Sequence, residues 1–293
     1  MEKNNMMLDK WKNSGSYFTY KDQYQIFYKA EGKGEPLILV HGFPTASWDW
    51  SKIWDDLIQK YRVYSLDMLG YGFSSKPKKF KYTIASQVDL WEFFLRKNDI
   101  TSFHILAHDY GDTVVQEMLA RSKENDNYEF EIKSVVFLNG GMFPETNFPT
   151  ITQKLLLTPF GVLLKHFMGR NTLAKNFKKI FGKNTQPSDQ EIDEFWRLID
   201  YNEGKDVLPK LIKYLTERDT YKIRWREAIQ HTNMPKRLID GGFDPISGKH
   251  MAMFYKEIVP NADVIVLEEI GHYPQVEAPE EILHHYYEFR DRL

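Results

Sequence analysis

Four short segments of the 293-residue sequence place a carboxylate, a histidine or a glycine where a catalytic site needs one. They read HGFP (residues 41–44), AHDYG (107–111), GGFDP (241–245) and IGHYP (270–274). Each follows a stretch with the hydrophobic pattern of a strand. In an open sheet of parallel strands, ligands bind at the loops that follow the carboxyl ends of the strands. The four segments therefore predict a single site.

The AHDYG segment has the form of a nucleophile elbow, which is a tight turn between a strand and a helix. Ala107 and Gly111 are the small residues that such a turn requires, and Asp109 between them would project above the sheet beside a helix N-terminus. A carboxylate at this position can attack carbon and form an ester intermediate. The alternative interpretation is that Asp109 only caps the helix that follows.

The HGFP segment is expected to lie close to this elbow, because Gly42 lets the loop approach it. The backbone N–H groups of Phe43 and Tyr110 would then face the carbonyl oxygen of an Asp109 ester and form an oxyanion hole. His41 is expected to brace the loop through hydrogen bonds rather than to transfer a proton.

Asp244 and His272 complete the set of candidate catalytic residues. Both lie on late loops, and the chain order of nucleophile, acid and histidine matches the order found with a nucleophile elbow. Asp244 is predicted to fix the tautomer of His272, with Glu145 and Asp240 as its rivals by position in the chain. The histidines do not have metal-ligand spacing beside a carboxylate, so we expect no metal.

Strand and helix patterns alternate up to residue 138 and again near the end of the chain, which predicts a parallel sheet with crossover helices. From Met142 to His231 the patterns are helical, and Ser188 and Glu191 form the pattern of a capping box. Such an insertion is expected to cover the carboxyl ends of the strands. Strands are expected at residues 25–29, 36–40, 61–66, 103–107, 133–138, 237–239 and 263–267, and helices at 48–58, 83–97, 113–121, 251–258 and from 279 onward.

Composition and charge exclude several classes of protein. With 39 basic and 41 acidic residues and no long basic stripe, nucleic acid is not an expected partner. The absence of cysteine excludes disulfides, thiolate catalysis and cysteine-bound zinc. The start of the chain lacks the apolar core of a signal peptide, and no stretch has the length and apolarity of a membrane span. We therefore expect a cytoplasmic protein that acts on a small molecule, and the oligomeric state stays open.

Over nearly its whole length the sequence resembles the α/β-hydrolase superfamily. The segments HGFPTASWDW, LDMLGYGFSSKP, LAHDYGD and GHYPQ resemble its epoxide hydrolase and haloalkane dehalogenase branch. Residues 139–146, NGGMFPET, resemble the group of mesoderm-specific transcript proteins and their bacterial relatives. The resemblance implies an α/β-hydrolase fold with a mostly parallel eight-stranded sheet. Residues 1–141 and 234–293 would form the core, and residues 142–233 a helical cap, or lid.

The resemblance also implies roles for the candidate residues. Asp109 matches the nucleophile, Asp244 the charge-relay acid and His272 the general base. The oxyanion donors match Phe43 and Tyr110. Water and three side chains suffice for this chemistry, so no cofactor is expected. In the cap, Tyr214 resembles one of two tyrosines that donate a proton to an epoxide, with Tyr201 and Tyr221 as candidates for the second. The alternative is that Tyr214 is only a packed cap tyrosine.

Departures from the pattern distinguish members of the branch. Dehalogenases that resemble this chain have Trp after the nucleophile, where this chain has Tyr110, and many have Asn where it has Phe43. Epoxide hydrolysis is therefore favoured over haloalkane hydrolysis. A non-catalytic scaffold that binds a small molecule or a protein is the alternative of another class. An esterase is less favoured, because the elbow has no serine.

Overall fold

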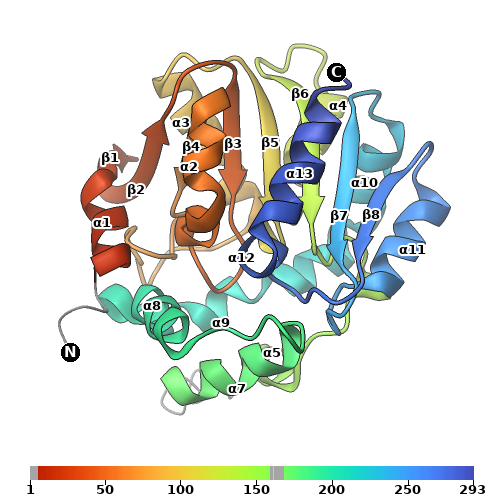
Figure 1. Ribbon diagram of the computed structural model, residues 1–293. Coiled ribbons are helices and arrows are strands. Elements are labelled where there is room, and N and C mark those ends of the chain that lie inside the picture. Colours follow the sequence, from red (N-terminus) through yellow and green to blue (C-terminus); the bar gives the residue numbers. More distant parts are fainter. Residues whose placement is uncertain (1–5, 159–160, 162–167) are drawn as a thin grey trace.

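The computed structural model describes residues 6–158, 161 and 168–293. Its centre is an eight-stranded sheet with the order β1-β2-β4-β3-β5-β6-β7-β8 (Figure 1). Only β1–β2 and β2–β4 pair antiparallel, so the expected mostly parallel sheet is confirmed. The strands are β1 (Ser16–Tyr20), β2 (Tyr24–Glu31), β3 (Pro36–Val40), β4 (Arg62–Leu66), β5 (Ser102–His108), β6 (Glu131–Leu138), β7 (Lys236–Gly241) and β8 (Asp263–Leu267).

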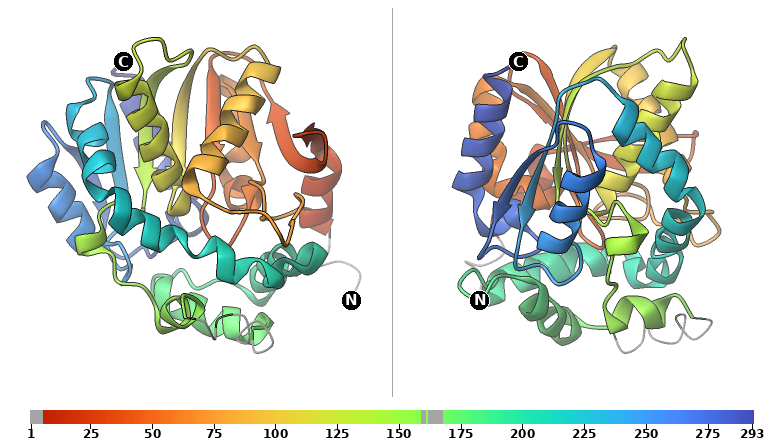
Figure 2. Two further views of the ribbon diagram at one scale, coloured as in Figure 1. Left: turned by 180° about the vertical axis from the view of Figure 1, so that it is seen from behind. Right: turned by 90° about the vertical axis from the view of Figure 1, so that its right-hand side faces the viewer.

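Helices cover both faces of the sheet. In Figure 1, α2 and α13 lie in front of it, and the view from behind in Figure 2 shows α3, α4 and α10 on the opposite face. Central strands such as β3, with the sequence PLILV, are therefore buried on both sides and form continuous apolar runs. These helices and their neighbours are α1 (Met6–Ser14), the 3-10 turn η1 (Ser47–Trp50), α2 (Ser51–Lys60), α3 (Ile84–Lys97), α4 (Tyr110–Glu124), α11 (Lys249–Ile258), α12 (Pro274–Glu277) and α13 (Pro279–Arg290).

Between β6 and β7 the described residues form helices and 3-10 turns, and no strand. Most of these elements lie across the end of the sheet toward which the parallel strands point, at the bottom of Figure 1. The capping box expected at Ser188 is confirmed: its Oγ accepts from the Glu191 amide at 3.2 Å. The segment contains η2 (Pro144–Thr146), α5 (Ile151–Leu156), α7 (Arg170–Ile180), α8 (Asp189–Asp200), η3 (Tyr201–Asp206), α9 (Leu208–Leu211) and α10 (Tyr214–His231).

Two elements near the start of the chain were not expected. Helix α1 buries Leu8 and Trp11, and edge strand β1 buries only Phe18 and Tyr20, because its other residues face solvent. So short an alternation in a polar segment gives a weak strand signal. The helix expected at residues 48–58 is also divided, since it begins as the 3-10 turn η1 and continues as α2. Within the described residues, no helix is long and apolar enough to cross a membrane.

Candidate active site

Asp109 occupies a sharp turn between β5 and α4. Its φ of 50° lies in the left-handed region, which side chains other than glycine seldom adopt. The turn also leaves no room at Gly111, where an added Cβ would lie 2.2 Å from the Val40 carbonyl oxygen. The positive φ and this tight fit give the strand–turn–helix geometry that the AHDYG segment predicted.

The loop after β3 supplies a backbone donor to this carboxylate. The Phe43 amide donates to Oδ2 of Asp109 at 3.0 Å. Close approach depends on Gly42, since a Cβ there would lie 2.7 Å from Nδ1 of His108. Tyr110 is the first residue of α4, where an amide has no partner within its own helix. The Phe43 amide therefore already donates to the Asp109 carboxylate, and the Tyr110 amide is available as a second donor at the start of α4.

His41 braces the loop after β3 through two hydrogen bonds. Its Nε2 accepts from the Met68 amide at 3.1 Å, so Nδ1 carries the proton and donates to the Gly42 carbonyl at 2.8 Å. Complete burial lowers the pKa of His41 to about 4, despite the nearby Asp109 charge. A neutral imidazole that makes two hydrogen bonds to the backbone fits the bracing role expected for this residue.

Asp244, and neither Glu145 nor Asp240, is the carboxylate that contacts His272. Its Oδ2 lies 2.8 Å from Nδ1 of the imidazole. Glu145 instead pairs with Arg226. The Asp244 carboxylate also accepts hydrogen bonds from the Ile246 amide at 2.8 Å, the Ser247 amide and hydroxyl at 3.1 and 3.0 Å, and Asn139 Nδ2 at 3.2 Å. These donors fix the carboxylate and, through it, the orientation of the imidazole.

Charge within the site shifts both partners toward their ionised forms. Burial would lower the pKa of His272, but the carboxylates of Asp244 and Asp109 raise it to about 9. Burial would raise the pKa of Asp244, but the adjacent His272 and the hydrogen bonds hold it below its ordinary value. The resting site therefore holds an imidazolium against an ionised Asp244 at neutral pH.

His108 is a site residue that sequence reasoning missed. It directly precedes Asp109, and its Nε2 lies 2.7 Å from the carbonyl oxygen of His272. Its ring centroid is 5.2 Å from that of His272. Burial, with the His272 charge, lowers its pKa to about 3, so His108 is neutral and donates from Nε2. This hydrogen bond connects the loop that carries His272 to the turn that carries Asp109.

Arg218 on α10 was missed as well. Its side chain is buried, with Nη2 3.2 Å from the Asp109 carbonyl oxygen and 3.8 Å from Asp109 Oδ1. Its Nε donates to Thr113 Oγ1 at 2.8 Å, and its guanidinium lies over the Tyr214 ring. A buried cation thus accompanies the nucleophile. The signal in the sequence was only an arginine four residues after Tyr214, one turn along the same helix.

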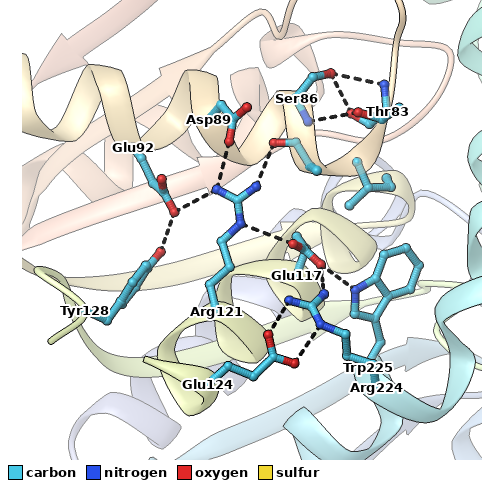
Figure 3. A network of polar contacts seen from close by, with 12 residues as sticks. Thr83, Ser86, Asp89, Glu92, Glu117, Arg121, Glu124, Tyr128, Arg224 and Trp225 are labelled. Atoms are coloured by element: carbon cyan, nitrogen blue, oxygen red, sulfur yellow. Dashed lines mark hydrogen bonds and ion pairs between the residues drawn. The ribbon is translucent and has the colours of Figure 1, made fainter. Parts of the chain in front are cut away.

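A polar network fixes α10 on α4 (Figure 3). Glu117 of α4 accepts from Trp225 Nε1 at 2.8 Å and pairs with Arg224, which also bonds Glu124 at 2.7 and 2.8 Å. Glu117 also accepts from Arg121 at 3.1 Å, which links the network to α3. Because α4 begins beside Asp109, this attachment sets the position of Arg218 and Tyr214 above the elbow.

Of the three cap tyrosines, the structure brings only Tyr214 to the site. Its buried ring lies 5.8 Å from that of Phe43 and 4.8 Å from that of Tyr110, centroid to centroid. It therefore packs on both residues expected to supply the oxyanion donors.

Tyr201 and Tyr221 lie elsewhere. Tyr201 contacts Phe73 and Lys12 on the side of the molecule near α1. Tyr221 is 43% exposed and packs on Trp225. It follows Tyr214 by seven residues, which is about 10 Å along a helix that runs away from the elbow over α4. Neither lines the pocket described next.

An apolar pocket reaches from the cap helices down to His272. It holds about 710 Å³ of empty space, including its open mouth. Phe43, Pro44, Ile246, His272 and Tyr273 line its floor. The walls are mainly apolar and come from α5, α7 and α8, with Leu156, Leu173, Phe177, Ile180, Trp196 and Ile199. The described residues contain no group of three His, Asp or Glu side chains placed to hold a metal ion.

Fold and site define a member of a known family. Residues 35–279 match the family model described as alpha/beta hydrolase fold, and the chain belongs to that family. Among curated proteins it is similar to the mesoderm-specific transcript homolog protein of Bos taurus, with 38% identity over 296 residues that cover 96% of this chain and 87% of the relative. The human protein matches to the same extent.

Solved structures with the same fold include two enzymes of the branch that the motifs resemble. A haloalkane dehalogenase variant from Bradyrhizobium elkanii superimposes with a TM-score of 0.79 and 18% identity, covering 94% of this chain and 95% of that one. The epoxide hydrolase CorEH superimposes with a TM-score of 0.77 and 17% identity, covering 94% and 97%. At these identities the likeness shows the fold alone.

Proposed function

We propose that this protein hydrolyses a small apolar substrate through a covalent ester on Asp109, and that the substrate is an epoxide. The observation that carries the proposal is the carboxylate of Asp109 at the elbow, bonded to the Phe43 amide, while Phe43 and His272 both line the apolar pocket. A carboxylate in this place can attack an electrophilic carbon directly. A serine hydrolase would need a hydroxyl at the same position.

The charge state of His272 suits a two-step reaction. Attack by Asp109 opens the C–O bond of the epoxide and leaves an alkoxide, while the carboxylate becomes a neutral ester. Loss of that negative charge removes one of the causes that raise the pKa of His272. The imidazolium can then release its proton toward the alkoxide, directly or through Tyr214 or water, and the neutral imidazole is ready to act as a base.

In the second step His272 accepts a proton from water, and the hydroxide attacks the ester carbonyl. The negative charge that develops on the carbonyl oxygen faces the Phe43 amide, with the Tyr110 amide as second donor. Collapse of the tetrahedral intermediate breaks the bond between the ester carbonyl carbon and the alkyl oxygen. The proton of the attacking hydroxyl passes to the departing alkoxide, so the diol leaves with Asp109 ionised and His272 protonated, as in the resting site. Asp244 stabilises the imidazolium whenever His272 is protonated, through its bond to Nδ1.

Two side chains favour an epoxide over a haloalkane. The side chains of Phe43 and Tyr110 carry no indole or carboxamide N–H that could bind a departing halide. The ring of Tyr110 is buried, packed between the rings of Tyr71 and Tyr214. The apolar pocket walls match a hydrocarbon substrate in either case.

The test is a single turnover in heavy-oxygen water with panels of epoxides and haloalkanes. Because water attacks the ester carbonyl, one heavy oxygen is expected in the peptide that contains Asp109 and none in the first diol released. Asp109→Ala is expected to abolish turnover, and Asp126→Ala, at an exposed position on the core, serves as the matched control.

The outcomes separate the candidate functions. Halide release with label in the same peptide would assign the dehalogenase reaction. Label in the diol and none in the protein would show direct attack by water and contradict the ester. Binding of panel compounds without turnover would favour the non-catalytic scaffold.

A further inference from the structure

The outer face of helix α5 exposes large apolar side chains. Ile151 is 76% exposed and Leu155 45%, and Phe148, just before the helix, is 58% exposed. Leu157 at its end is also exposed. These four residues are called the apolar edge below. Single exposed apolar residues are ordinary, but Ile151 and Leu155 lie one helical turn apart on the same face of α5 and so present a shared apolar surface.

Exposed lysines lie on α5, the helix of the apolar edge, and on its neighbour α7. Lys154 on α5 and Lys175, Lys178 and Lys179 on α7 are exposed, and none of them forms an ion pair with another described residue. The sequences of the two helices, ITQKLL and RNTLAKNFKKI, contain no acidic residue. Arg170 is excluded from this group, because it forms ion pairs with both Asp189 and Asp193.

The two helices present these residues on one side of the molecule. Asn176 Nδ2 donates to Thr152 Oγ1 at 3.3 Å, so α5 and α7 are in contact. On α7 the buried residues Leu173, Phe177 and Ile180 face inward, and helical spacing turns the lysines outward. In both views of Figure 2 the segment lies at the bottom of the molecule, away from the sheet.

The apolar pocket opens beside this face. Thr150, Thr152 and Gln153 of the α5 segment and Gly169 before α7 line it. An added Cβ on Gly169 would meet no atom within 4 Å, which indicates open space at this point. The walls of the pocket therefore continue into the face that carries the apolar edge and the lysines.

We propose that this face docks on the surface of a membrane that contains anionic lipids. The apolar edge enters the boundary between headgroups and acyl chains, and the lysines contact the headgroup phosphates. An apolar substrate dissolved in the bilayer would then reach the pocket without passing through water. The inference does not depend on which bond the protein hydrolyses.

The experiment is vesicle flotation with the full chain. Vesicles of phosphatidylcholine alone are compared with vesicles that contain phosphatidylglycerol in addition. We expect binding to the anionic vesicles and at least tenfold less to the neutral ones, because several lysines near an anionic surface attract it together. High salt is expected to reduce the binding.

Two variants and two matched controls test the face itself. Ile151→Glu with Leu155→Glu, and Lys175→Gln with Lys178→Gln and Lys179→Gln, are each expected to weaken anionic binding at least tenfold. The apolar control is Ile223→Glu, which is 66% exposed on α10. The charge control carries glutamine at three exposed lysines of the core, namely Lys33, Lys97 and Lys256. Circular dichroism checks that all four fold.

The proposal stands if only the two face variants lose binding. It is overturned if the parent protein binds neither kind of vesicle, if it binds both equally, or if the controls lose as much as the face variants. Vesicle binding is measured without a substrate, so failure here leaves the proposed hydrolysis to its own test.

Discussion

The Phe43 amide donates to Oδ2 of Asp109 at 3.0 Å across 66 positions of sequence. The oxygen that would become the carbonyl oxygen of an ester therefore already lies at a backbone donor. Such a hydrogen bond becomes stronger once the same oxygen is an oxyanion, because the preorganised dipole of the amide then interacts with a full charge. The contact therefore favours hydrolysis of the ester, which is also the step that requires His272.

Replacing His272 by Gln is expected to leave ester formation possible and to block its hydrolysis. Attack by Asp109 needs no water, whereas hydrolysis needs an activated one. General-base catalysis contributes about 10²–10⁴-fold, so the adduct should persist for minutes. Intact-mass spectrometry after mixing with a reactive epoxide is expected to show a gain equal to the substrate mass, located in the Asp109 peptide.

Two further variants accompany this measurement. Asp109→Ala should form no adduct, and His284→Gln, on the final helix, should turn over like the parent. An inactive His272→Gln protein without adduct, on a substrate that the parent hydrolyses, would mean that the histidine acts before or during attack. That result would favour direct attack by activated water.

Neutralising Asp109 is expected to lower the pKa of His272. In the free protein the imidazole should titrate near 9, because Asp244 and Asp109 outweigh the effect of burial. Asp109→Asn imitates the neutral ester and should move this pKa downward. Imidazole resonances followed by NMR between pH 6 and 10 give both values, with Asp126→Asn as the control. An unchanged pKa would contradict the charge coupling on which the two-step mechanism depends.

Removing the buried cation beside the nucleophile should destabilise the fold. Arg218→Gln leaves the carboxylate of Asp109 buried without its cation, and breaking such a pair costs about 3–5 kcal/mol. Arg226→Gln on the same helix removes a pair with the exposed Glu145 and should cost about 1 kcal/mol or less. Urea unfolding of both variants makes the comparison. Equal losses would show that Arg218 matters only for packing.

Glu217 should make stability depend on pH near neutrality. It accepts from the Ile84 amide at 3.2 Å, and burial, with the nearby Glu117, raises its pKa from about 4.5 to about 7. A group with a raised pKa contributes stability that is fully present below pH 4.5 and is lost as the pH rises through 7. Relative to the parent, Glu217→Gln should therefore become more stable between pH 5 and pH 8.

Urea unfolding at several pH values measures this difference. Glu227→Gln, at an exposed position on the same helix, is the control and should show no such trend. A difference between parent and Glu217→Gln that stays constant with pH would contradict the raised pKa.

The candidate triad could be predicted from the sequence because its determinants are local. The small residues that flank Asp109, the glycine before His272 and the strand before each loop lie within a few positions of the residue concerned. The contact between Asp244 and His272 then follows from strand order, because β7 and β8 are neighbours in the sheet. Local turns and a parallel sheet leave few alternatives.

Arg218 and His108 could not be predicted in the same way. The place of Arg218 depends on how α10 packs on α4, and the contacts that set it, such as Trp225 to Glu117, span about 100 residues. Tyr201 and Tyr221 were wrongly expected near the site, because a helical pattern in the sequence does not show where in the fold the helix packs. His108 was hidden because a histidine inside an apolar strand is usually structural. Strand β1 was missed because only Phe18 and Tyr20 carry its pattern.

The cap helices leave and rejoin the sheet at neighbouring strands, with Val135 of β6 in register with Lys236 of β7. Asp109, Asp244 and His272 all lie outside the inserted stretch, whereas most of the pocket walls lie within it. Helix α10 must stay, because it is the crossover that joins the parallel strands β6 and β7 and it carries Arg218 to Asp109. The helices before it, α5, α7 and α8, carry the pocket walls, so replacing only these helices with those of a relative is expected to change which molecule enters the pocket and to leave Asp109, Asp244 and His272 in place.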